Sequence, residues 1–138
     1  MDMEKFKAVI NEKDRFGKFN KMQVTEVRPG YAEAILEISE NSFNGVGTVQ
    51  GGAIFSLSDL AFAAASNADG VPTVAMNCSF SFIRPGSGAY LKAVAEVVNN
   101  GKRTVVYDVN VYNSAEKLVA RGTITGFHVE GVPPLKAE

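Results

Sequence analysis

Two reactive residue types are almost absent from this sequence. In 138 residues there is one cysteine, Cys78, and one histidine, His128. A single cysteine excludes a disulfide within the chain, and such sparse cysteine usage is the default of a reducing, cytoplasmic compartment. A lone histidine near the carboxyl end argues against a histidine-based catalytic triad and against a metal site. We therefore expect no metal site, and we interpret Cys78 as a small core or interface residue. No cofactor is expected either.

Charge is also sparse, and neither sign dominates. Charged residues make up 21% of the chain, the formal net charge is −1, and the Lys and Arg residues are scattered. Without a basic run, binding to nucleic acid has no electrostatic support. Charged residues among the first seven interrupt any signal-peptide pattern, and Asp59 breaks the longest apolar stretch, which argues against a membrane span. We expect a cytoplasmic protein with neither a nucleic acid nor a membrane as partner.

Hydrophobic residues, by contrast, make up 46% of the chain. This size and composition suit one domain with a modest core, so we expect a single domain over residues 1–138. An amphipathic pattern near the amino end predicts a short helix within residues 1–15. Residues 130–138, which include two adjacent prolines, are predicted to be a loosely ordered tail.

Most of the remaining sequence alternates between apolar and polar residues, as half-buried strands do. The predicted strands cover residues 19–27, 31–38, 73–83, 91–98, 104–112 and 118–129. The sequence Asn99-Asn100-Gly101 predicts a hairpin with a type I′ turn, because Asn-Gly tolerates the positive φ that this turn requires.

The segment from Gly51 to Ser66 differs from the strands. It is rich in Ala, Leu, Phe and Ile, contains no Pro and is far longer than a strand needs, which predicts a helix. Apolar residues fall on nearly every side of this helix, so it is expected to be central and buried. Such a helix needs a sheet that curls around it and a second covering surface, and dimerisation is the simplest source of the second.

Asp59 is the one charged residue of this predicted helix. A carboxylate in an apolar setting costs free energy unless it is hydrogen-bonded, paired or needed for chemistry. Structural aspartates are usually found at helix caps, turns and exposed faces, and Asp59 is predicted at none of these places. Because perturbed acids concentrate at active sites, the setting favours a catalytic role for Asp59.

Five short segments stand out by their residues and their order. They are Asn44-Gly45, the run from Val49-Gln50-Gly51-Gly52 to Asp59, Phe82-Ile83-Arg84-Pro85-Gly86, Gly101-Lys102-Arg103 and Val119-Ala120-Arg121-Gly122. Together they resemble the hotdog-fold acyl-CoA thioesterases of the phenylacetate-degradation type, over residues 16–126. The resemblance implies an α+β hotdog fold, in which a curved antiparallel sheet of about five to six strands wraps one long central helix. It also implies an acyl-CoA substrate, in which coenzyme A is part of the substrate and not a cofactor.

One position departs from the pattern of this family. The family has a His before the Gly-Gly pair, and this sequence has Gln50. Glutamine keeps hydrogen-bonding capacity but cannot change its protonation near neutral pH, so it can orient a loop or the thioester but cannot donate a proton. A thiol leaving group, with a pKa of about 8.5 by analogy with cysteine, can depart as a thiolate without an acid.

The resemblance and the chemistry of the residues imply a catalytic group of Asp59, Gly51, Asn44 and Gln50, with Gly52 beside it. The N–H of Gly51, at the positive end of the helix, would polarise the thioester carbonyl. Asp59 would act as a general base on water or, alternatively, as a nucleophile. In an apolar interface the pKa of Asp59 should lie above its usual value. Asn44 and Gln50 would position the water or the carbonyl, although Asn44-Gly45 by itself indicates only a turn.

Gly51 and Asp59 cannot act together within one chain if both lie on the central helix. Eight residues separate them, which is roughly 12 Å along a helix axis. Two antiparallel helices across a two-fold axis would bring Gly51 of one subunit next to Asp59 of the other. We therefore predict a homodimer, and the resemblance suggests a homotetramer of two such dimers.

Coenzyme A carries phosphates, so cations are expected at the mouth of the site. The residues implied for substrate and coenzyme binding, besides Gly52, are Arg84, Pro85, Gly86, Lys102, Arg103, Ser79 and Ser81. For the three cations the alternative is a solvated loop charge. For the two serines, which share one face of the third strand, the alternative is a plain polar sheet face.

The predicted function is hydrolysis of an acyl-CoA thioester to a free acid and coenzyme A. By resemblance, the acyl group is aryl-acetyl or a short- to medium-length chain. A hotdog dehydratase or hydratase is an alternative enzyme, but such enzymes usually pair a histidine with the acid. A non-catalytic acyl-CoA-binding module and a purely structural oligomer are the alternatives from other classes, and neither explains why Asp59 is present.

Overall fold

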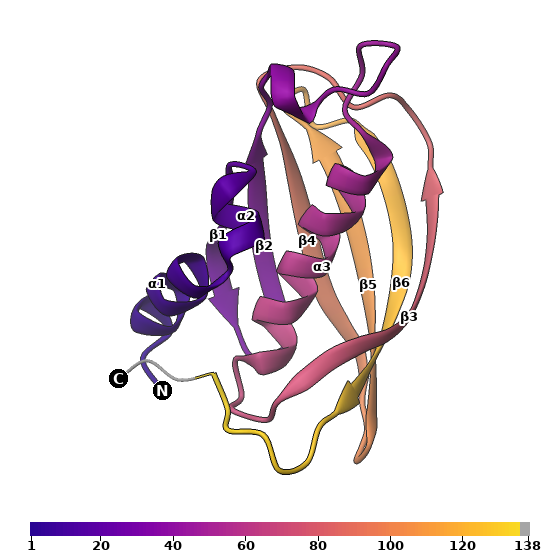
Figure 1. Ribbon diagram of the computed structural model, residues 1–138. Helices are drawn as coiled ribbons and strands as arrows, with labels where there is room; N and C mark the ends of the chain where they lie inside the picture. Colours follow the sequence, from indigo (N-terminus) through magenta and orange to yellow (C-terminus); the bar gives the residue numbers. More distant parts are fainter. Residues whose placement is uncertain (136–138) are drawn as a thin grey trace.

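The computed structural model describes residues 1–135 (Figure 1). In chain order the elements are α1 (Met3–Lys13), α2 (Arg15–Phe19), β1 (Met22–Arg28), β2 (Tyr31–Glu37), a 3₁₀ turn (Glu40–Ser42), α3 (Gly51–Asn67), β3 (Thr73–Phe82), β4 (Tyr90–Asn100), β5 (Thr104–Asn113) and β6 (Leu118–His128). The six strands form one antiparallel sheet in the order β1-β2-β4-β5-β6-β3. The predicted architecture, one long helix wrapped by a curved antiparallel sheet, is confirmed.

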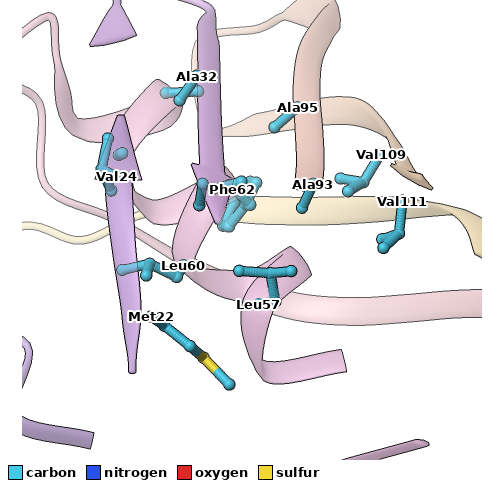
Figure 2. Packing of buried hydrophobic residues seen from close by; sticks show 14 of the residues in the cluster. Met22, Val24, Ala32, Leu57, Leu60, Phe62, Ala93, Ala95, Val109 and Val111 are labelled. Atoms are coloured by element: carbon cyan, nitrogen blue, oxygen red, sulfur yellow. The ribbon is translucent and has the colours of Figure 1, made fainter. Parts of the chain in front are cut away.

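Small residues in the middle of the sheet allow α3 to lie close against its concave face (Figure 1). Ala32 of β2 pairs with Ala95 of β4, Ala34 pairs with Ala93, and all four are fully buried. Figure 2 shows Leu57 and Phe62 of α3 beside this alanine layer and the larger valines of β5. The size of the side chains therefore sets the depth at which the helix lies.

A short helix that the sequence pattern did not predict precedes the first strand. The strand expected from residue 19 begins at Met22, because α2 occupies Arg15–Phe19. Asp14 caps α2, since its carboxylate accepts a hydrogen bond from the Gly17 N–H at 2.8 Å. Phe19, which was assigned to the strand, is instead 87% exposed at the end of α2.

The β4–β5 hairpin is present, but its turn is not the predicted type I′. β4 continues through Asn100, and neither Asn100 nor Gly101 has a positive φ. The Gly101 N–H donates to the Thr104 carbonyl at 2.9 Å, and a Cβ on Gly101 would lie 2.7 Å from that oxygen. Gly101 is therefore required by a close backbone approach and not by its dihedral angles.

The two edges of the sheet, β1 and β3, are finished differently. Along β1, the Asn11 amide of α1 accepts from the Val24 N–H at 2.7 Å and donates to the Val24 carbonyl at 2.9 Å. Along β3, between Val74 and Phe82, no side chain of residues 1–135 bonds the outer backbone edge. The apolar side chains of Val74, Met76 and Phe82 are each more than half exposed there. One edge is thus covered by the chain itself and the other is open.

After β6 the chain forms no further helix or strand as far as residue 135, where Leu135 packs partly buried against the core. The last part of the predicted loose tail, residues 136–138, lies outside the described residues. No helix among the described residues is long and apolar enough to cross a membrane.

Candidate active site

The amino end of α3 presents two backbone donors without partners. Gln50 is the N-cap; its N–H donates to the Ser42 carbonyl at 2.8 Å, and its carbonyl accepts from the Ala53 N–H at 2.9 Å. Within residues 1–135 no acceptor is bonded to the N–H of Gly51 or Gly52. Free amides at the positive end of a 17-residue helix are suited to stabilising a developing negative charge.

A cavity of about 320 Å³ lies at this helix end. It brings together predicted residues from three segments of the chain, namely Asn44, Gly51, Arg84, Pro85 and Gly86. A Cβ on Gly51 would lie 3.7 Å from the Phe82 ring, an ordinary contact distance. The packing of the chain therefore does not require glycine at position 51, and the space in front of its backbone stays open.

Asn44 is engaged in holding the loop that leads into α3. Its side-chain oxygen accepts from the N–H groups of Val46 and Thr48 at 3.0 and 3.1 Å, and its side-chain nitrogen donates to the Thr48 hydroxyl at 3.0 Å. These bonds are those of a turn, which was the alternative reading of Asn44-Gly45. Asn44 thus acts on the cavity through the shape of the loop.

The segment after β3 is held against the same loop. The Val49 N–H donates to the Gly86 carbonyl at 3.0 Å, and a Cβ on the buried Gly86 would lie 2.9 Å from the Val49 Cβ. Arg84 is exposed, and its guanidinium donates to the Leu118 carbonyl at 3.0 Å. Gly86 is therefore needed for close packing, while Arg84 holds a positive charge at the rim of the cavity.

Asp59 lies two turns further along α3, half-buried on the side of the helix that the sheet does not cover. It lines a separate cavity of about 240 Å³, together with Asp14 and Phe16 from the α1–α2 corner. Burial raises the pKa of Asp59, and the Asp14 carboxylate raises this pKa further, as the apolar setting predicted. On β3, the pKa of the Cys78 thiol is raised by burial and by the charge of Asp59.

A third cavity, of about 330 Å³, adjoins the one at Asp59 and contains Gln50 and Gly52. The two cavities share Phe16, Met22 and Ser56, so together they form a mostly apolar groove along α3. Gln50 makes no side-chain hydrogen bond to cap the helix, and its side chain is exposed at the groove.

Several predicted site residues are not brought together within one chain. Gly51 and Asp59 line different cavities. Lys102 and Arg103 lie at the other end of the sheet, because the register places Thr104 and Thr73 together at that end and Phe82 at the end that holds Gly51. The ten residues of β3 span roughly 30 Å.

The two serines of β3 lie on the outer face of the sheet. Ser79 and Ser81 are exposed and pair with Thr123 and Arg121 of β6, while Cys78 and Phe80 pack toward α3. Neither serine lines any of the three cavities. In a single chain they therefore form part of a polar sheet face.

Asp14 and Phe16 are the site residues that sequence reasoning missed. An Asp before a short apolar-containing segment is a helix N-cap signal, so the cap itself was readable. The approach of Asp14 to Asp59, 45 positions later, arises only from the packing of α2 on α3. No group of three or more metal-ligating side chains occurs among the described residues.

Residues 46–120 match the family model of the thioesterase superfamily. The chain belongs to this superfamily, and it is a thioester hydrolase with the hotdog fold that its motifs predicted.

The similarity extends to individual members of the superfamily. The chain is 37% identical over 125 residues to the acyl-coenzyme A thioesterase PaaI of Escherichia coli, covering 83% of this chain and 89% of that protein. The structure of the E. coli PaaI protein from the phenylacetic acid degradation operon matches with a TM-score of 0.88 and 31% identity, covering 94% of this chain and 95% of the other. A Streptococcus mutans protein bound to acetyl CoA matches with a TM-score of 0.76 and 27% identity, covering 86% and 94%. The predicted resemblance to PaaI-type thioesterases is confirmed.

Proposed function

We propose that this thioester hydrolase cleaves an acyl-CoA to a free acid and coenzyme A, at a site formed by two copies of the chain. The observation that carries the proposal is the separation of two complementary groups on one helix. The unpartnered N–H donor of Gly51 lies at one cavity, and the Asp59 carboxylate, whose pKa is raised, lines another. The E. coli relative is an acyl-CoA thioesterase and the S. mutans protein binds acetyl CoA, which supports the substrate class.

A two-fold dimer through the open β3 edge would unite these groups. Antiparallel pairing of β3 with its copy places the two α3 helices antiparallel, with their uncovered sides facing each other. Gly51 of one subunit then lies near the Asp59 position of the other, and each dimer has two equivalent sites. The same symmetry moves the Lys102–Arg103 hairpin of one subunit toward the Arg84 end of the other. Three cations would then be available for the phosphates of coenzyme A.

The chemical step follows from these positions. The N–H groups of Gly51 and Gly52 polarise the thioester carbonyl and stabilise the oxyanion, and one such donor is typically worth about 10²–10³ in rate. Asp59 of the other subunit removes a proton from water as the water oxygen attacks the carbonyl carbon. The C–S bond then breaks, and the thiolate departs without a general acid. Gln50 orients the carbonyl or the water, and the scheme uses no cofactor.

The acyl group would occupy the groove between α3 and the α2–β1 corner. Its lining includes Phe16, Met22, Leu36 and Ala53, and the part next to Gly52 has a volume of about 330 Å³. An apolar groove of this size favours an aryl-acetyl group or a short- to medium-length acyl chain.

Release of free thiol from a panel of acyl-CoA thioesters tests the proposal. The panel runs from acetyl to long-chain acyl and includes phenylacetyl and hydroxybenzoyl thioesters. Asp59→Ala is expected to lower hydrolysis about a hundredfold or more, because it removes the general base. Asp108→Ala is the matched control, since Asp108 is exposed on β5 away from the cavities. If neither the wild type nor Asp59→Ala turns over any thioester while both bind acyl-CoA, the chain is a binding module and the proposal is wrong.

A further inference from the structure

A second carboxylate, that of Asp14, lines the cavity that holds Asp59. Asp14 is fixed from both sides by backbone hydrogen bonds. Its N–H donates to the Ile10 carbonyl at 2.9 Å at the end of α1. Its carboxylate accepts from the Gly17 N–H at 2.8 Å at the beginning of α2. The side chain therefore has a defined position and cannot turn freely toward solvent.

The contact between α2 and α3 brings this fixed carboxylate to the catalytic helix. Gly17 is buried, and a Cβ on it would lie 3.0 Å from an Asp14 carboxylate oxygen and 3.5 Å from Leu60 Cδ2. Leu60 follows Asp59 directly in α3. The absence of a side chain at position 17 thus lets the start of α2 lie on α3 beside Asp59.

We propose that Asp14 is a positioning residue for thioester hydrolysis, whose fixed negative charge makes Asp59 a stronger base. This inference rests on the proposed function, in which Asp59 accepts the proton of water. Asp14 would not touch the substrate; it acts through the charge that it places across the cavity.

The electrostatic surroundings agree with this role. Burial is the largest cause of the raised pKa of Asp59, and the negative charge of Asp14 in the same cavity is the second, because a like charge disfavours ionisation of the Asp59 carboxyl. No other residue of α3 is ionisable, and β1 contributes Met22 to the cavity. On β3, Cys78 does not line the cavity, and burial and the charge of Asp59 raise the pKa of its thiol. Among the cations of α2, Lys18 is bonded to Glu12 at 2.7 Å and Arg15 is exposed, and neither lines this cavity.

Asp14→Asn separates the charge from the structure. Asparagine is as good an N-cap as aspartate, so the bond to the Gly17 N–H and the size of the side chain are retained. Without the charge, the pKa of Asp59 falls, and Asp59 becomes deprotonated at lower pH but is a weaker base. Asp2→Asn is the matched control, because Asp2 caps α1 in the same way through the Glu4 and Lys5 N–H groups but lies outside the cavity.

The test is the pH dependence of kcat/KM for the preferred acyl-CoA. For Asp14→Asn we expect the acidic limb to move to lower pH, so that kcat/KM on that limb exceeds the wild-type value by about twofold or more. On the plateau it should equal the wild-type value or fall below it. A purely structural role would lower kcat/KM at every pH without moving the limb, and that result, or an equal shift in Asp2→Asn, overturns the inference.

A second readout keeps this inference separate from the proposed function. The Asp59 carboxyl carbon is titrated by ¹³C NMR in the wild type and in Asp14→Asn, with its signal assigned from its loss in Asp59→Asn. If its titration midpoint does not move, the inference is wrong whatever the activities are. If the midpoint moves but Asp59→Ala hydrolyses thioesters as fast as the wild type, the electrostatic link stands and the role of Asp59 as base fails.

Discussion

The two edges of the sheet differ in how far the chain itself covers them, and in the proposed dimer the uncovered edge receives the second copy. At β1 the Asn11 amide occupies both hydrogen-bonding groups of Val24, and Lys7 donates to the Thr25 carbonyl at 3.3 Å. A helix covers this edge, and a β-bulge between Val24 and Glu26 interrupts it. Such devices are how proteins prevent strand addition.

The β3 edge has only one of these devices. It contains a bulge between Ala75 and Asn77, but it exposes apolar side chains and, among the described residues, has no side-chain cover on its backbone. Under the proposed function, this open apolar edge, next to the uncovered helix side that carries Asp59, is the interaction surface. The difference between the edges indicates where a partner would bind.

The largest expected effect comes from charging the open edge. Met76 and Val98 form a matched pair, because both are apolar residues at β-bulges and are 61% and 59% exposed. They differ in position, since Met76 is on the edge strand β3 and Val98 is on the interior strand β4. In the proposed dimer, Met76→Lys would bring two like charges together across the two-fold axis, which costs several kcal/mol. We expect loss of the dimer by sedimentation analysis and about a hundredfold loss of hydrolysis with Asp59 intact.

Val98→Lys is the control for this substitution, and it should keep both the dimer and the activity. If Met76→Lys remains a fully active dimer, the β3 edge is not the interface and the shared site has to be sought elsewhere.

A smaller effect, on stability, is expected from removing the side chain that covers the β1 edge. Asn11→Ala removes both partners of the buried Val24 backbone, and leaving two such groups unpaired costs about 2–4 kcal/mol of the free energy of unfolding. Urea unfolding measures this loss. Asn20→Ala, which removes one exposed bond to the Phe16 carbonyl, should change stability by no more than about 0.5 kcal/mol. Equal losses in the two variants would mean that Asn11 does not protect the edge.

The smallest expected effect is the gain in free energy of unfolding when the Asp59 carboxylate is replaced. Because the pKa of Asp59 is raised in the folded state, its ionisation opposes folding. This penalty is absent below the unfolded pKa of about 3.9 and is fully present above the folded pKa. Asp59→Asn should therefore raise the free energy of unfolding at pH 7 by less than about 1 kcal/mol, which appears as a higher Tm. This gain should disappear as the pH falls toward 3. Thermal unfolding between pH 3 and 8, with Asp108→Asn as baseline, measures the gain; a gain that does not depend on pH contradicts the explanation.

Much of the fold was predictable because its signals are local. The alternation of Val105, Tyr107, Val109 and Val111 places one face of β5 in the core, and this pattern needs no knowledge of neighbouring strands. The short helix α2 was missed because one turn has too few residues for a period to appear, and Phe19 is apolar like a strand residue. The predicted type of the hairpin turn was wrong, because the close approach of Gly101 to Thr104 decides the form of the turn and the dihedral preference of Asn-Gly does not.

The candidate site divides in the same way. Gly51, Gly52 and Asp59 could be proposed as site residues from the sequence alone, because a Gly-Gly pair and a lone carboxylate in an apolar helix are unusual within one short segment. The sequence does not reveal that Asn44 is fully engaged in its own turn, because this depends on hydrogen bonds formed after folding. It also does not reveal that Lys102 and Arg103 lie at the far end of the sheet from Gly51, because this depends on the register of the strands.

The sequence by itself determined the family, the central helix, the order of the strands along the chain and the carboxylate to examine first, since these depend on residue type and on spacing along the chain. Only the tertiary structure decided which sheet edge is open, how far apart Gly51 and Asp59 lie within one chain, and that Asp14 faces Asp59. These are distances between segments far apart in the sequence, and they follow from how side chains pack, such as the alanine layer under α3 and the contact of Gly17 with Leu60.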